Sequence, residues 1–218
     1  PSVSADKWIE RIATAAPSDS RVPHHLLLIG GPDRISFEAQ AVLDERFSTG
    51  RLDVGDTPTG PFSWEACHAY AKKVVAYETG KVNVERQALL YSFATDSATQ
   101  EAYEGIALPL EERLGGLLGP GALTTLFGKE ATTAKLIGAL RARSPALVVT
   151  TSHGIEMPED PALWGALTDQ TFVGAAGGTA LSASVVPADP IAYGAVILAF
   201  ACFSAGVPPR SAHAFLNG

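Results

Sequence analysis

Short apolar runs alternate with amphipathic stretches along most of this chain. The clearest runs cover residues 24–31, 87–94, 122–127, 146–152 and 195–201, and each is rich in aliphatic or β-branched residues. Runs of this length and composition predict buried strands. An alternation of such strands with helices is typical of a mostly parallel sheet that is covered on both faces. The sequence therefore predicts an α/β fold.

Helical patterns occupy the segments between these runs. The strongest cover residues 64–77, 97–114 and 129–143. Pro109 lies inside the second pattern and predicts a bend or break there, because proline removes a backbone donor and crowds the preceding turn. The segment 157–190 is rich in glycine, alanine and proline. It predicts either a surface excursion or a small hairpin.

Length and composition limit the number of domains that this chain can form. The chain has 218 residues, of which 46% are hydrophobic, so it can bury one large α/β core. Residues 1–20 predict a short N-terminal helix and a polar linker, and residues 21–218 predict the main domain. The last strand-like run lies close to the end of the printed sequence, where a further helix and strand would normally follow. We therefore expect a C-terminal part of the domain to be missing.

Charge and hydropathy exclude two classes of partner. The net charge of −7 and the lack of a Lys/Arg cluster argue against a nucleic-acid partner. No apolar run reaches the length of a membrane span, and the N-terminus shows no signal-peptide pattern. These features favour a cytoplasmic protein, although the start at Pro1 suggests an excised N-terminus and leaves secretion open.

Two of the predicted strands end in a reactive residue. His153 follows the run 146–152, and Cys202 follows the run 195–201. Parallel strands bring their carboxyl ends to one edge of a sheet, where α/β proteins place their ligands. An imidazole beside a thiol forms a Cys/His dyad for acyl transfer, because the imidazole removes the thiol proton and later protonates the leaving amine. The alternative is an incidental pair, since cysteine is often simply buried.

An acyl-transfer site also needs hydrogen-bond donors for the oxyanion that forms on the substrate. Gly154 follows His153 and has no side chain, so a substrate could approach its backbone N–H closely. The backbone N–H of Cys202 is the second predicted donor.

The motifs around these residues resemble a known family. The segments VVTTSHG and LAFACFSAG, which contain His153 and Cys202, are similar to the His-Gly and Ala-Cys motifs of caspase-like cysteine peptidases of clan CD. Upstream, LLLIGGPDRISF, FSTGRLDV and AKKVVAYETGK resemble the gingipain branch. LFGKEATTAKLIGAL is similar to a segment that precedes the catalytic histidine in gingipains and in bacterial CHAT-type domains. The resemblance covers about residues 24 to 206 in consistent order.

The resemblance implies a caspase-hemoglobinase-like three-layer sandwich and cleavage after one preferred side chain, called P1. By position it makes Cys202 the nucleophile, His153 the general base and acid, and Gly154 an oxyanion donor. Asp96 falls in a loop that resembles the one carrying the acidic specificity residue of arginine-directed gingipains, which implies pairing with Arg or Lys. The alternative for Asp96 is that it caps the following helix. Trp164 is a candidate for a substrate-binding wall or for simple packing.

Other candidate residues point to no additional chemistry. His24 and His25 lack a third ligand at recognisable spacing, so no metal site is predicted. Cys67 is expected to be an inert buried thiol, and His68 beside it a packed or solvated residue. Residues 174–178 are rich in glycine but match neither a phosphate loop nor a dinucleotide motif. No cofactor is therefore expected.

The sequence thus predicts a cysteine endopeptidase that acts on protein or peptide substrates, and the resemblance implies cleavage after Arg or Lys as one possibility. We expect it to be the protease module of a larger bacterial protein, whose other domains or a partner protein could control its activation. The alternative is a catalytically silent interaction or scaffold module with the same fold.

Overall fold

The computed structural model describes residue 7 and residues 23–31, 34–54, 62–82, 85–154, 167–168, 180–181 and 194–202. The chain forms two units, residues 1–71 and residues 72–218. The α3 helix (Trp64–Glu78) runs through the boundary between them. The predicted linker before residue 21 and most of the predicted N-terminal helix lie outside the described residues.

The first unit contains a two-stranded parallel sheet with the helix α2 between its strands. Strand β1 (His25–Ile29) pairs with β2 (Ser48–Leu52), and α2 (Phe37–Asp44) connects them. Ser36 starts α2 by accepting a hydrogen bond from the backbone N–H of Ala39 at 3.2 Å. A small core of Leu28, Leu43 and Phe47 holds the helix on the sheet.

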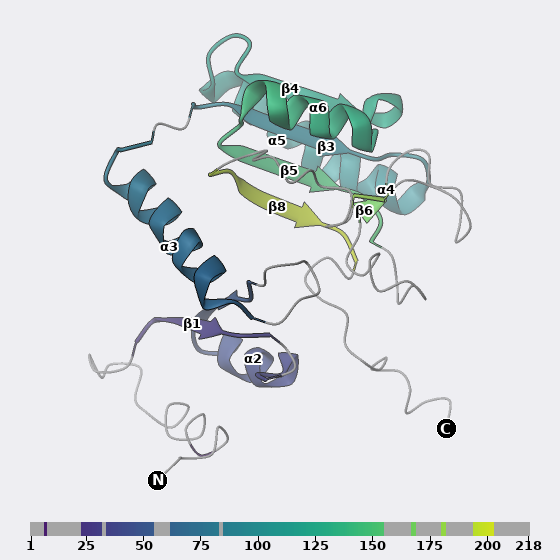
Figure 1. Cartoon of the computed structure of the whole chain (residues 1–218). Coiled ribbons are helices and arrows are strands. Elements are labelled where there is room, and N and C mark those ends of the chain that lie inside the picture. Colours follow the sequence, from purple (N-terminus) through teal and green to yellow (C-terminus); the bar gives the residue numbers. More distant parts are fainter. Residues whose placement is uncertain are drawn as a thin grey trace, which may run out of the picture. The chain divides into compact units, whose positions relative to one another are not determined.

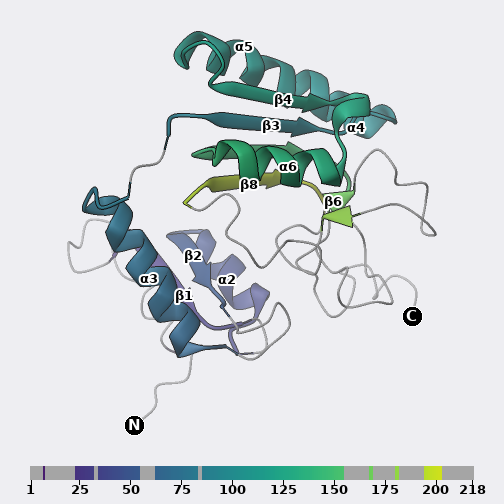
Figure 2. The ribbon, with the colours of Figure 1, turned by 45° about the horizontal axis from the view of Figure 1, so that its top comes forward.

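The second unit is built on a four-stranded parallel sheet in the order β4-β3-β5-β8. The strands are β3 (Ala88–Ser92), β4 (Leu123–Phe127), β5 (Leu147–Thr151) and β8 (Val196–Phe200). Helices join β3 to β4 and β4 to β5, and they lie on both sides of the sheet: α6 (Thr133–Arg143) on one side, and α4 (Ser97–Ala102) and α5 (Leu108–Leu117) on the other (Figures 1 and 2). The prediction of an α/β fold with a mostly parallel sheet is therefore confirmed.

The helical stretch after β3 is continuous but irregular. It consists of α4 (Ser97–Ala102), a π-helical segment η1 (Tyr103–Ala107) and α5 (Leu108–Leu117). Pro109 is the second residue of α5 and follows the π-helical turn directly, and a local π turn is a common adjustment where a residue that cannot donate stands within a helix. The expected irregularity at Pro109 is thus present as a change of helix type, and no break interrupts the helix.

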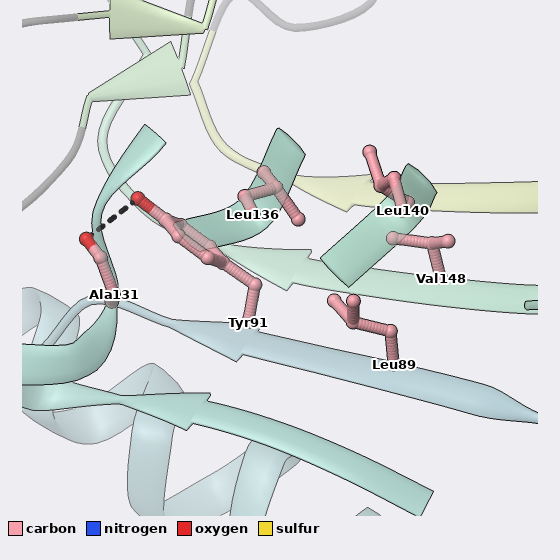
Figure 3. Packing of buried hydrophobic residues seen from close by; sticks show 6 residues of the cluster. All are labelled: Leu89, Tyr91, Ala131, Leu136, Leu140 and Val148. Atoms are coloured by element: carbon pink, nitrogen blue, oxygen red, sulfur yellow. Dashed lines mark hydrogen bonds between the residues drawn. The ribbon is translucent and has the colours of Figure 1, made fainter. Parts of the chain in front are cut away.

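A buried apolar cluster fixes α6 (Thr133–Arg143) on the sheet. Leu136 and Leu140 of α6 pack with Leu89 of β3 and Val148 of β5, as Figure 3 shows. The Tyr91 hydroxyl in the same cluster donates a hydrogen bond to the carbonyl oxygen of Ala131 at 2.9 Å. This bond satisfies a polar group that would otherwise be costly to bury. Thr132, after a short 3-10 turn η2 (Gly128–Glu130), caps the N-terminus of α6.

Two expectations about burial were wrong. Strand β8 is exposed along its whole length, with Val196, Ile197, Leu198 and Phe200 between 55% and 60% exposed. It lies at the end of the described sheet, paired with β5 alone among the described strands. Strand β1 is also exposed at alternate positions, since Leu27 is 61% exposed.

Part of the segment 157–190 forms a small antiparallel pair. Strand β6 (Leu167–Thr168) pairs with β7 (Ala180–Leu181), which agrees with the predicted hairpin. Within the described segments, no helix has the length and apolar character needed to cross a membrane.

Candidate active site

The ends of β5 and β8 bring His153 and Cys202 to the same edge of the sheet. The two strands are parallel, with Thr151 opposite Phe200, so each candidate residue lies two positions beyond a paired strand end. The backbone N–H of Ser152 donates to the carbonyl oxygen of Phe200 at 3.2 Å and extends this pairing by one step. The predicted placement of the two residues at one edge is what the structure shows.

His153 and Cys202 also line a single pocket of about 310 Å³. The described residues of its lining come from α4, from the end of β5 and from the end of β8: Ala98, Thr99, Ala102, Ser152, His153, Ala199, Phe200, Ala201 and Cys202. The thiol of Cys202 is exposed and forms no disulfide. Its position lets a substrate reach it from solvent.

Gly154 lies directly against the backbone of Cys202. A Cβ atom added at position 154 would overlap the carbonyl oxygen of Cys202, so only glycine fits here. The close approach of the two backbones places the two predicted oxyanion donors in one neighbourhood. It also gives a physical reason for the His-Gly dipeptide at this strand end.

His153 is held in place by a carboxylate. Its Nε2 atom lies 2.5 Å from Oδ2 of Asp96, which follows the neighbouring strand β3. Because a carboxylate can only accept, Nε2 carries the hydrogen, and Nδ1 is then the basic nitrogen of the neutral ring. Phe93, which is fully buried just after β3, contacts the imidazole edge to face at 6.1 Å between ring centroids.

Asp96 also forms the N-cap of α4, as one of the two interpretations predicted. Its Oδ1 atom accepts from the backbone N–H and from the hydroxyl of Thr99, both at 3.0 Å. These contacts lower the pKa of the Asp96 carboxyl from 3.8 to about 2, first through the Thr99 backbone N–H and next through His153. Asp96 is therefore ionised at neutral pH.

The remaining predicted residues lie elsewhere. Trp164 is outside the described residues, as are residues 174–178. His24, His25 and His68 are exposed, and Cys67 on α3 is half-buried, so the expectation of a buried thiol there was wrong. In the described part of the chain, no three His, Cys, Asp or Glu side chains lie close enough to hold a metal ion.

Sequence reasoning missed two features of this site. It did not identify Phe93 as a contact of His153, and it did not connect Asp96 with His153. The signal for both was the pairing of β3 with β5, because neighbouring parallel strands place the residues after their ends side by side. Strand order cannot be derived from the apolar runs alone.

Comparisons with known proteins identify no relative of this chain. No family model matches it, no curated protein matches it, and no solved structure matches it.

Proposed function

We propose that this chain is the catalytic module of a caspase-like cysteine endopeptidase, with Cys202 as nucleophile and His153 as general base and acid. The observation that supports it most is the shared pocket at the ends of β5 and β8, which both residues line. The motifs around His153 and Cys202 and the alternation of strands and helices also support it. We further propose that the module belongs to a larger bacterial protein.

The Asp96 carboxylate prepares the imidazole for proton transfer. With the Nε2 hydrogen bonded to Asp96, the Nδ1 nitrogen is the one that accepts the thiol proton from Cys202. The thiolate is the effective nucleophile, because a thiol is a much weaker one. The negative charge of Asp96 then stabilises the imidazolium that this transfer creates.

The reaction follows from these groups. The Cys202 sulfur attacks the peptide carbonyl carbon and forms a C–S bond, while the carbonyl oxygen takes the negative charge. The backbone N–H groups of Gly154 and Cys202 donate to that oxygen. As the C–N bond breaks, His153 returns its proton to the leaving amine. Water then attacks the thioester, giving its proton to His153, and the thiol is restored as the acid leaves.

Labelling of the thiol tests the dyad directly. Iodoacetamide at limiting concentration should alkylate Cys202 at least about tenfold faster than Cys67, because the proposal gives Cys202 a base, His153, in the same pocket. The His153→Ala variant should lose this advantage. Mass spectrometry of proteolytic fragments assigns the label to each cysteine.

The chain offers matched controls for this experiment. Cys67→Ala and His68→Ala change the same residue types outside the pocket and should leave the labelling of Cys202 unchanged. Equal labelling of both cysteines, or a rate insensitive to His153→Ala, would contradict the proposal. That outcome would favour the silent interaction module.

A further inference from the structure

The pocket beside Cys202 is lined mostly by small apolar side chains. Four of its described residues are alanines from α4 and from the end of β8, and Phe200 adds an aromatic ring. Thr99, Ser152 and His153 supply the polar atoms. A volume of about 310 Å³ lies at the lower end of the range for ligand pockets. It suits one side chain of a peptide next to the thiol.

No described residue of the pocket lining carries a carboxylate. Asp96, the residue expected to pair with Arg or Lys, is absent from that lining, and both its oxygens accept hydrogen bonds from the protein. The Asp96 side chain is 46% exposed and keeps its bonds to Thr99 and His153, so a basic side chain that paired with it would do so outside the described lining of the pocket. A guanidinium packed among the alanines and Phe200 would find no counter-charge in the described lining of the pocket.

We propose that this pocket binds an uncharged, apolar P1 side chain, such as that of leucine, and disfavours Arg and Lys. This specificity rests on the proposed peptidase function. It differs from the expectation of a basic P1 residue, because Asp96, the carboxylate required for that preference, is absent from the described lining of the pocket.

Two peptidyl acyloxymethyl ketones, identical except for Leu or Arg at P1, test the proposal. Each forms a thioether with the active thiol and releases a carboxylate, so intact mass reports the rate. We expect the Leu probe to label Cys202 at least about tenfold faster than the Arg probe, as apolar pockets discriminate at this level. Equal rates, or faster labelling by the Arg probe, would overturn the proposal.

A variant of the pocket sharpens the result. Ala98 is in the first turn of α4, where an acidic residue is well tolerated. Ala98→Asp should lower the ratio of the Leu-probe rate to the Arg-probe rate by about tenfold, because the new carboxylate can pair with the guanidinium. Ala98→Asn, whose side chain has the same shape as Asp but no charge, should leave this ratio unchanged. An unchanged ratio in Ala98→Asp would show that the P1 side chain binds elsewhere and would overturn the assignment.

Alkylation by iodoacetamide distinguishes a wrong specificity assignment from a wrong peptidase function. If His153-dependent alkylation of Cys202 persists while the Leu probe has no advantage, the dyad stands and the specificity assignment falls. If Cys202 shows no His153-dependent reactivity, both fall together.

Discussion

Strands β5 and β8 are parallel neighbours of equal length, and each carries one residue of the candidate dyad, yet they differ sharply in burial. In β5, Val148 is 2% exposed and Thr151 is 1% exposed, whereas in β8 Ile197 and Phe200 are 55% and 58% exposed. The candidate base, His153, therefore follows a strand that is buried and paired on both sides. The candidate nucleophile, Cys202, follows a strand that, within the described sheet, pairs on one side.

The difference extends to the side chains of the dyad. His153 is bonded to Asp96 and contacts the buried ring of Phe93, so residues from the β3 end orient it. Cys202 is exposed at the pocket. The imidazole is thus the preorganised partner, and the position of the thiol depends mainly on the backbone pairing of β8 with β5.

The largest expected effect comes from the carboxylate that orients the base. Asp96→Asn should lower the His153-dependent reactivity of Cys202 by at least about 100-fold, because a neutral amide neither selects the tautomer nor stabilises the imidazolium. Asparagine caps helices about as well as aspartate, so the stability of the protein should change little. Rates of acyloxymethyl ketone labelling and urea unfolding midpoints measure the two effects separately.

An unchanged labelling rate in Asp96→Asn would show that His153 works without the carboxylate. Thr99→Ala provides the converse control. It removes the hydroxyl with which Thr99 completes the capping box of Asp96, while Asp96 keeps its bond to His153, so stability should fall by about 1 kcal/mol with a smaller loss of reactivity.

The second prediction tests the contrast between the strands themselves. Val148 and Ile197 are partners in the register of β5 and β8. Val148→Ala should reduce the free energy of unfolding by about 2 kcal/mol, because it removes methyl groups packed in the core and leaves a cavity. Ile197→Ala should cost less than about 0.5 kcal/mol, since its side chain is already exposed. Urea denaturation of both variants measures the difference.

A cost for Ile197→Ala equal to that for Val148→Ala would mean that β8 is covered in solution. That result would remove the difference in burial between β5, which precedes the candidate base His153, and β8, which precedes the candidate nucleophile Cys202.

Much of the fold could be predicted from the sequence. The apolar runs located β3, β4, β5 and β8 to within one or two residues at each end. The common edge for His153 and Cys202 followed from parallel strands alone. The roles of these residues remain predictions, because geometry shows proximity and not turnover.

The rest depends on information that an apolar run does not contain. The run at 195–201 is at least as apolar as the run at 146–152, so hydropathy could not distinguish the exposed strand from the buried one. Asp96 had two local interpretations, helix cap and specificity residue. Its third role, as the partner of His153, depends on β3 lying beside β5, and that order is decided by tertiary packing.

The smallest expected effect is a dependence of stability on pH. The pKa of Asp96 is about 2 in the folded chain against an ordinary 3.8, so its ionised form is favoured by folding. This contribution is fully present above about pH 4 and is lost as pH falls toward 2, because protonation removes the bonds to Thr99 and His153. Solvent screening keeps it small, since the side chain is 46% exposed. The urea midpoint of the wild-type chain minus that of Asp96→Asn should be larger at pH 5 than at pH 2. An equal difference at both pH values would show that Asp96 is not held by these contacts.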